Sequence, residues 1–374
     1  MAYFEITGVP LRPADPGFSP TVNLLLEKGR GLSIISDDGE IPSAIIRALT
    51  RRSNFVGEIF LNSRRIDPVP VRSRPIKVIG NGPGYNPNRT IRQNFESILS
   101  GTSFTDGEAI MLIERELSQG PLAGFGDEPS KSLDSNGRTI LAATCALMSG
   151  CELLIISGLP VMNGKKEKFV TWRPGYQLDG LLDLKNLLKR FRATWISTLT
   201  DAACVQVLSD HLAIFSGGNL IQEGSLRECM NAPNSRLVAD YLAFPKMNYR
   251  KCRVERDGPF FILHSGRFGF RVSDFIKRQL AHREGDELIM GVRPEDLNIR
   301  GYQTGDPTVL NLARVLRVDT LPGIQLAWLD VEGQDWVAIC DPIQAVFTGQ
   351  LIELRPDPER IHIFHPINNT SLLN

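Results

Sequence analysis

The sequence lacks an apolar run long enough to cross a membrane. One of its longest apolar runs, Cys151–Leu159, is short and contains Glu152 and Ser157, whereas a membrane-spanning helix needs about 20 consecutive, mostly apolar residues. The first residues, MAYFEITGVP, show neither a basic start nor a continuous apolar segment, so we expect no signal peptide there.

The sequence also lacks an excess of either charge and any paired cysteine motif. Lys+Arg and Asp+Glu both number 42 among 374 residues, which argues against a general nucleic-acid binder, because such proteins carry a basic face. The six cysteines are scattered, with no C-x-x-C motif and no neighbouring histidine: Cys145, Cys151, Cys204, Cys229, Cys252 and Cys340. We expect reduced core thiols, with neither disulfides nor a metal site.

Strands and helices alternate over the first 245 residues. The apolar run from Leu32 to Ile35 predicts a strand that ends in a turn at 36–40, and a helical pattern follows from Ile41 to Leu49. The continuous apolar segment 153–156 is typical of a parallel strand that is covered on both faces. Further elements are expected at 57–66 (strand, turn, strand), 89–150 (helices around a Gly/Pro/Ser-rich loop at 119–137), 179–192 (helix), 194–199 (strand), 201–210 (helix), 211–216 and 219–222 (strands) and 225–243 (one amphipathic helix).

The pattern changes after Phe244 and Pro245. Short alternating strands follow, for example at 324–329, 335–339 and 351–354, and Gly, Pro and Asp turns separate them. We therefore predict two domains: an α/β domain over 1–245 with a helical part at about 89–150, and an all-β domain over 246–374, a small barrel of the OB type.

The order of these elements resembles the ATP-binding subunits of bacterial ABC importers of the maltose, sugar and glycerol-phosphate type. The matching motifs of the first domain are Gly57-Glu58-Ile59, Pro87-x-x-Thr90-x-x-x-Asn94, Gly224-Ser225 and Pro233-Asn234-x-x-x-Val238-Ala239. Those of the second are Gly291-Val292-Arg293-Pro294-Glu295-Asp296-Leu297 and Asp357-Pro358-Glu359-Arg360-Ile361-His362. Each motif is weak alone, but their common order covers essentially the whole chain. The resemblance implies an ABC ATPase core of the P-loop NTPase type with a helical subdomain, followed by a regulatory, OB-like (TOBE) domain.

The segment that aligns with the phosphate-binding loop has lost most of that loop's chemistry. The loop has the form G-x-x-x-x-G-K-[ST]: backbone N–H groups cradle phosphate, the lysine neutralises its charge, and the hydroxyl holds Mg²⁺. The aligned residues here are Ser36, Asp37, Asp38, Gly39, Glu40, Ile41, Pro42, Ser43 and Ala44. Ser36 and Ile41 replace the two glycines and Pro42 replaces the lysine, so that only Ser43 matches.

Three carboxylates lie in this segment, where an anion should bind. A carboxylate about 4 Å from a phosphate charge costs about 4 kcal/mol at an effective dielectric constant of about 20. Asp37, Asp38 and Glu40 also precede a predicted helix, where acidic side chains cap free N–H groups, and Pro42 suits the first helical turn. We hypothesise that these carboxylates take the place of the phosphate. The alternative is that they only cap a helix.

The other catalytic positions implied by the resemblance have changed as well. Asn81 aligns with the family's glutamine that contacts Mg²⁺. Ser157 and Gly158 lie where the family has an Asp-Glu pair at a strand end, and Thr200 aligns with the family's histidine after a later strand. Hydrolysis needs Mg²⁺, a lysine and a group that positions water, so we expect no intact catalytic residue. The five histidines align with none of these roles and are expected to be structural: His211, His264, His282, His362 and His365.

The family's L-S-G-G-Q signature loop, which contacts the ATP of the partner subunit, aligns with Leu133-Asp134-Ser135-Asn136-Gly137. The serine that should donate a hydrogen bond to the γ-phosphate is Asp134, which only accepts hydrogen bonds when ionised. The second composite site is therefore expected to be weakened too, unless the partner carries a compensating Arg or Lys.

The resemblance implies a degenerate nucleotide-binding subunit of a binding-protein-dependent importer for sugars, polyols or similar solutes. It would pair with an intact ATPase paralogue beneath two membrane-spanning permease subunits, at the cytoplasmic face of the inner membrane, and meet the periplasmic or lipoprotein solute-binding protein only indirectly. We expect no productive cofactor on this chain, and ATP with Mg²⁺ at the partner's site. The alternatives are a free-standing regulatory or scaffold protein and an ATPase that uses unorthodox residues.

One segment that the resemblance associates with docking of the membrane subunit is retained. Its residues are Gly84, Tyr85, Pro87, Thr90 and Asn94. The alternative is that Pro87, Thr90 and Asn94 are only turn and cap residues.

Overall fold

The computed structural model describes residues 3–10, 21–37, 40–50, 57–80, 84–157, 178–199, 202–243, 245–301, 311–321 and 323–373. Contacts divide the chain into two compact units, 1–226 and 227–374. The helix α7 (Leu226–Asn231) begins at this division, so the predicted boundary near residue 245 comes later in the chain than the division by contacts.

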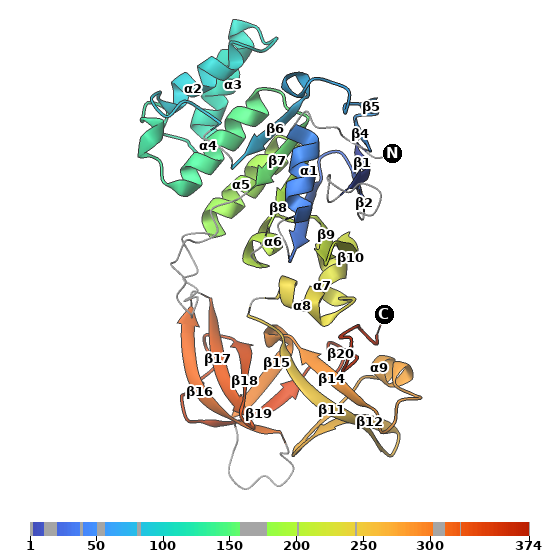
Figure 1. The fold of residues 1–374 in the computed structure, drawn as a ribbon. Coiled ribbons are helices and arrows are strands. Elements are labelled where there is room, and N and C mark those ends of the chain that lie inside the picture. Colours follow the sequence, from blue (N-terminus) through green and yellow to red (C-terminus); the bar gives the residue numbers. More distant parts are fainter. Residues whose placement is uncertain are drawn as a thin grey trace. The chain divides into compact units, whose positions relative to one another are not determined.

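A six-stranded sheet forms the centre of the first unit (Figure 1). Its order is β10 (Asn219–Ser225), β9 (His211–Ser216), β3 (Gly31–Ser36), β8 (Trp195–Thr198), β7 (Leu153–Ser157) and β6 (Ile76–Ile79). All neighbours are parallel except β10, which runs antiparallel to β9. Every residue of β7 is buried, which confirms the parallel strand expected from its continuous apolar sequence.

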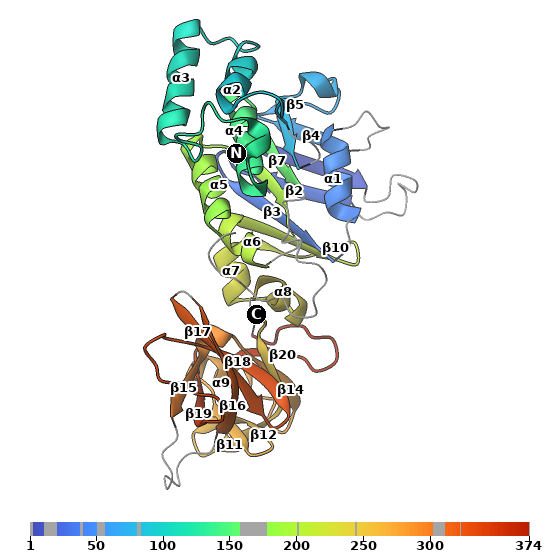
Figure 2. The same cartoon turned by 90° about the vertical axis from the view of Figure 1, so that its left-hand side faces the viewer.

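Helices cover both faces of this sheet (Figure 2). The helix α1 (Glu40–Thr50) lies on one face, and α4 (Ser135–Met148) and α5 (Leu178–Arg190) lie on the other; α6 (Ala202–Leu208) packs against β3 and α5. The predicted apolar face of α1 is buried, and it consists of Ile41, Ala44, Ile45, Ala48 and Leu49. It packs against the six-stranded sheet and a smaller sheet of β2 (Thr21–Leu26), β1 (Phe4–Pro10), β4 (Glu58–Leu61) and β5 (Arg64–Arg65).

The predicted hairpin at 57–66 is confirmed. Its strands β4 and β5 pair antiparallel, and the turn between them consists of Asn62 and Ser63, with φ values of 52° and 60°. Such paired positive φ angles match the twist of a tight hairpin turn. A 3-10 turn, η1 (Val71–Ser73), then leads to β6.

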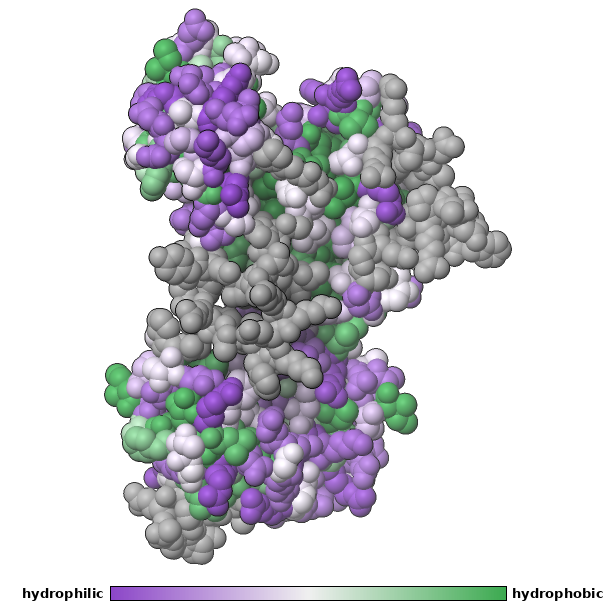
Figure 3. Space-filling view, turned by 60° about the vertical axis from the view of Figure 1, so that its left-hand side comes forward, coloured by the Kyte–Doolittle hydropathy of each residue, from purple (hydrophilic) through white to green (hydrophobic). Residues whose placement is uncertain are grey.

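The helical part of the first unit contains α2 (Ile91–Leu99), α3 (Asp106–Gln119) and α4, with a 3-10 turn η2 (Ser130–Ser132) in the loop before α4. Both α2 and α3 begin with a capping box, formed by Thr90 with Gln93 and by Thr105 with Glu108. The surface of this helical part is mostly hydrophilic (Figure 3). The helices confirm the pattern expected over 89–150.

The second unit contains two antiparallel five-stranded sheets over one shared core, as expected for the OB-like domain. One sheet has the order β13 (Phe268–Arg271), β12 (Phe260–Ser265), β11 (Asn248–Asp257), β14 (Glu287–Val292) and β20 (His362–Phe364). The other has the order β15 (Leu297–Gly301), β19 (Leu351–Pro356), β16 (Leu312–Leu321), β17 (Ile324–Val331) and β18 (Gln334–Cys340). The core between them contains Phe268 and Trp336.

Two details of the predicted secondary structure are wrong. The single helix expected over 225–243 is two helices, α7 and α8 (Arg236–Leu242), because Pro233 has no N–H to continue α7 and Ser235 caps α8. The domain expected to be all-β also contains a short helix, α9 (Asp274–Gln279), which Ser273 caps, and a 3-10 turn, η3 (Pro294–Asp296). In the described part of the chain, no helix has the length and apolar content to span a membrane.

Candidate functional site

The carboxyl ends of five parallel strands form one edge of the main sheet. The described residues at these ends are Ser36 and Asp37 after β3, Gly80 after β6, Ser157 of β7, Thr198 and Leu199 at β8, and Ser216 and Gly217 at β9. Ligands of open α/β sheets bind at this edge. It is therefore the candidate nucleotide site, and it contains the aligned phosphate loop.

Asp37 is hydrogen-bonded to the chain itself at this edge. Its carboxylate accepts hydrogen bonds from the Ser216 hydroxyl and from the backbone N–H of Gly217, whose nitrogen lies 3.3 Å from Oδ2 and 3.4 Å from Oδ1. These donors belong to the turn between β9 and β10, so Asp37 joins the end of β3 to the neighbouring strand. Asp38 and Gly39 lie outside the described residues, as does the side chain of Glu40, and the substitution of phosphate by all three carboxylates stays a prediction.

The first turn of α1 holds Pro42 where the resemblance places the phosphate-binding lysine. Because α1 begins at Glu40, Pro42 lies among the first helical residues, whose N–H groups have no partner within a helix. Proline therefore suits this position, but it supplies neither a charge nor an N–H group. Ser43 is exposed, while Ile41 and Ala44 point into the core.

The ends of β6 and β7 are in close contact. Ser157 is buried, and a Cβ atom at Gly80, whose φ is +111°, would lie only 1.5 Å from the Ser157 carbonyl oxygen. Only glycine fits there. Ser157 thus ends β7 with a hydroxyl where the resemblance implies an acidic residue, while Asn81, Gly158 and Thr200 lie outside the described residues.

The described part of this edge has no positive charge. Among the strand-end residues named above, Asp37 is the one ionisable side chain. A triphosphate needs cations and directed N–H groups, and the described residues of the edge instead place a carboxylate there.

The signature-loop equivalent forms the N-terminus of α4. Asp134 is the N-cap, and its Oδ1 accepts a hydrogen bond from the backbone N–H of Gly137 at 2.7 Å. Arg138 donates to the Leu133 carbonyl oxygen at 3.1 Å. A free helix N-terminus is a ready anion site; here the chain's own carboxylate takes up one of its donors.

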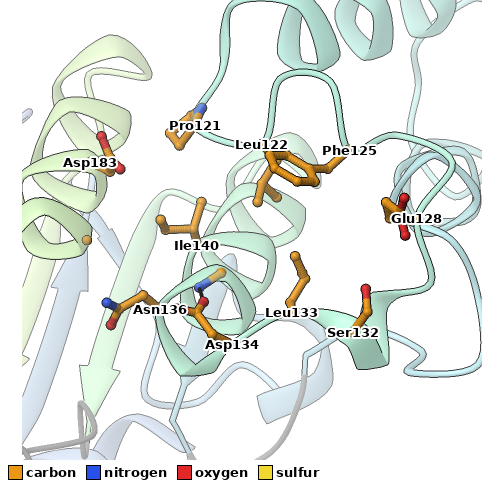
Figure 4. Close-up of a pocket in the computed structure, with 12 residues that line it drawn as sticks. Pro121, Leu122, Phe125, Glu128, Ser132, Leu133, Asp134, Asn136, Ile140 and Asp183 are labelled. Carbon is orange, nitrogen blue, oxygen red and sulfur yellow. Dashed lines mark hydrogen bonds between the residues drawn. The ribbon is translucent and has the colours of Figure 1, made fainter. Parts of the chain in front are cut away.

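A cavity of about 490 Å³ lies beside this N-terminus (Figure 4). Its lining consists of Pro121, Leu122, Phe125, Glu128, Ser132, Leu133, Asp134, Asn136, Gly137, Ile140, Gly180 and Asp183. Sequence reasoning singled out Asp134 but missed Glu128 and Asp183. No sequence signal links these acids, because Glu128 lies in the loop before η2 and Asp183 reaches the cavity only through the packing of α5 on α4.

The residues proposed for docking support the loop before α2. The side chain of Asn94 is buried; its Oδ1 accepts from the Asn86 N–H at 2.7 Å, and its Nδ2 donates to the carbonyl oxygens of Asn86 and Thr90 and to the Ser130 hydroxyl at 3.0, 2.9 and 2.8 Å. Thr90 caps α2. Gly84 has a φ of +63°, and burial raises the pKa of Tyr85. Docking of a membrane subunit by this loop stays a prediction.

The second unit matches a known family model, and relatives cover nearly the whole chain. The model described as the MalK OB fold domain matches residues 245–297. The sn-glycerol-3-phosphate import ATP-binding protein UgpC 2 of Agrobacterium fabrum is 23% identical over 354 residues, which are 94% of this chain and 90% of that protein. The sulfoquinovosyl glycerol transport ATP-binding protein SmoE of the same organism is 22% identical over 385 residues, or 98% of this chain and 100% of that protein.

Two further proteins are similar to this chain. The maltose/maltodextrin import ATP-binding protein MalK of Vibrio parahaemolyticus is 21% identical over 373 residues, or 98% of this chain and 95% of that protein. The solved structure of cbiO1 from Clostridium perfringens, part of the ABC transporter complex cbiONQ, aligns with 61% of this chain and 94% of that chain at 14% identity, with a TM-score of 0.48. Over nearly its whole length the chain is therefore similar to ABC import ATP-binding proteins, and its second unit contains a match to the MalK OB fold domain.

Proposed function

We propose that this chain is a subunit of a binding-protein-dependent ABC importer that keeps the fold of the ATP-binding subunits and does not hydrolyse ATP itself. It pairs with an intact ATPase paralogue and docks beneath two membrane-spanning permeases at the cytoplasmic face of the membrane. Its relatives are named for the import of glycerol phosphate, sulfoquinovosyl glycerol and maltodextrin, so we place the solute among sugars, polyols and similar compounds.

The phosphate-loop edge carries this proposal. The described residues provide the Asp37 carboxylate, bound by Ser216 and Gly217, and Pro42 in the first turn of α1. Phosphoryl transfer is catalysed by positioning and by stabilisation of negative charge. A site with an anion and a proline in these positions opposes both, because it repels the triphosphate and lacks the lysine that orients it.

The proposal assigns ATP and Mg²⁺ to the partner subunit. A working subunit contributes a lysine, a γ-phosphate sensor and an acidic residue to one composite site, and the partner contributes a signature loop. This chain lacks the first set of groups in sequence, so the site built on its own phosphate loop is the inactive one. The site built on the partner's phosphate loop then receives Asp134 in place of the signature serine.

Binding of Mg²⁺-ATP to the isolated chain tests the proposal. Isothermal titration calorimetry should detect no Mg²⁺-dependent binding in the micromolar range, while the intact paralogue, titrated under the same conditions, should bind. Saturable micromolar binding that disappears when Mg²⁺ is removed would contradict the proposal and favour an ATPase with unorthodox residues.

Co-purification from the native host tests the assembly. The proposal predicts that the tagged chain retains an ATPase paralogue and two permeases in detergent. A chain that elutes without permeases would contradict the transport role and favour a free-standing regulatory protein.

A further inference from the structure

The cavity beside Asp134 has the size of a ligand site. Its volume of about 490 Å³ lies in the range of roughly 300–1,000 Å³ that is typical of ligand pockets. Figure 4 shows Leu122, Leu133 and Ile140 around its middle, with Phe125 beside Leu122. Phe125 is 52% exposed, so part of this apolar wall lies open to an incoming group.

Acidic groups surround the apolar middle. Asp183, Asp134 and Glu128 lie on different sides of the cavity (Figure 4), and all three side chains are exposed. No lysine, arginine or histidine is among the described residues that line it. Arg138 lies close by, but it donates to the Leu133 carbonyl oxygen. The cavity therefore favours a ligand that combines a positive charge with apolar surface.

The arrangement is set by close packing of two helix starts. A Cβ atom at Gly180 would lie 2.7 Å from side-chain atoms of Asn136, so the first turn of α5 approaches the first turn of α4 as closely as only glycine permits. This contact brings Asp183 to the cavity that Asp134 borders. Since Asp134 also caps α4, two of the three carboxylates are held by regular secondary structure.

We propose that this cavity binds an arginine side chain of the partner ATPase subunit, carried next to an apolar residue. The proposal deepens the function proposed above and rests on it for the identity of the partner. The resemblance implies that the signature loop faces the partner subunit, and here Asp134 gives that loop a negative charge. An arginine satisfies carboxylates with several N–H donors while its methylene stem covers apolar surface.

Methyl NMR of the full-length chain tests the site directly, with Ile140 in the cavity wall as the reporter. The probes are the peptides N-acetyl-Leu-Arg-Leu-amide and N-acetyl-Leu-Glu-Leu-amide. We expect the arginine peptide to shift the Ile140 δ1-methyl signal in a saturable way that weakens with added salt, because exposed charge pairs are screened. The glutamate peptide should leave this signal in place.

Variants separate the carboxylates from the rest of the wall. In the triple variant Glu128→Gln, Asp134→Asn, Asp183→Asn the affinity for the arginine peptide should fall about fivefold or more, since each exposed charge pair contributes a modest amount. Asn keeps the cap of α4, and an unchanged methyl spectrum elsewhere verifies the fold. The matched control Glu284→Gln removes an exposed carboxylate of the second unit and should bind like the parent chain.

Three results would overturn the proposal: no shift of Ile140 with the arginine peptide, equal shifts with both peptides, or unchanged affinity in the triple variant. A cavity already filled by another part of this chain would give the first of these. Mg²⁺-ATP binding at the phosphate loop is measured separately, so that failure of the proposed function and failure of this site are distinguishable.

Discussion

At the scale of single residues, Asp37 and Asp134 lie in the two segments that align with the nucleotide-binding loops of the family. Each accepts a hydrogen bond from backbone N–H of the chain itself, Asp37 from Gly217 and Asp134 from Gly137. Backbone N–H groups are what such loops normally present to phosphate. In the signature-loop equivalent, the chain's own carboxylate takes up such a donor, the Gly137 N–H, whereas the donor to Asp37 belongs to the β9–β10 turn.

Asp134 should contribute to stability as a helix cap. Replacing it with Ala removes the acceptor for the Gly137 N–H, and we expect the free energy of unfolding to fall by about 1 kcal/mol in urea titrations. Asp134→Asn and Asp134→Ser retain an acceptor and should stay within a few tenths of the parent value. A loss as large in the Asn variant as in the Ala variant would show that the charge matters, not the cap.

His362 should make the second unit sensitive to acid. Burial, together with the nearby Arg293 guanidinium, lowers the pKa of His362 from 6.5 to about 4. Between these two pH values the unfolded chain binds a proton that the folded chain does not. The free energy of unfolding should therefore fall as the pH drops from about 6.5 to about 4, and this group should lower it no further at more acidic pH.

The variant His362→Phe keeps a ring that can stack on Phe364, whose centroid lies 6.3 Å from that of His362. Its unfolding midpoint in urea should change less between pH 6.5 and pH 4.5 than that of the parent chain. The control His282→Gln removes an exposed histidine and should follow the parent profile. A parent-like acid loss in His362→Phe would contradict this role of His362.

At the scale of elements, a buried carboxylate ties the helical part to the rest of the first unit. Glu116 of α3 is 2% exposed, and it accepts hydrogen bonds from Arg190 of α5 and, at 3.2 Å, from Arg115. Arg190 also donates to the Gln119 carbonyl oxygen at 3.1 Å. Arg190 of α5 therefore binds both the C-terminal end of α3 and the buried carboxylate of Glu116.

We expect Glu116→Ala to lower the free energy of unfolding of the first unit by about 2 kcal/mol, because charged hydrogen bonds are lost and Arg190 stays partly buried without its partner. Urea unfolding of the full chain measures this change. The control Glu114→Gln breaks the exposed pair with Arg92 and should cost about 0.5 kcal/mol or less. Equal losses in the two variants would contradict a special role for Glu116.

Elements with a clear pattern of apolar residues could be predicted from sequence, and elements that depend on tertiary contacts could not. The apolar face of α1 and the continuous apolar strand β7 follow directly from residues such as Ile41, Ile45 and Ile155. By contrast, α9 is too short to show a helical period, and the break between α7 and α8 depends on Pro233 overriding an amphipathic pattern. The hydrogen bonds of Asp37 to the β9–β10 turn, 180 residues away for Gly217, carry no local signal.

At the scale of the whole molecule, the chain combines an α/β unit with a second, β-rich unit that contains the match to the MalK OB fold domain. The described strand ends and the start of α4 present carboxylates where a nucleotide would need donors and cations. The two cores consist of apolar residues of the sheets and helices. Under the function proposed above, such a subunit would retain surfaces for assembly while its partner supplies the chemistry.

ATP turnover by the complex purified from the native host tests this account most directly. The measurement compares the complete transporter with a version in which the partner's acidic catalytic residue is replaced by its amide, and both are assayed with Mg²⁺-ATP in the presence of the solute-binding protein. The account predicts that turnover is lost when that single residue is changed, because this chain offers no second catalytic site. Turnover that survives the change would contradict it and assign ATP hydrolysis to this chain.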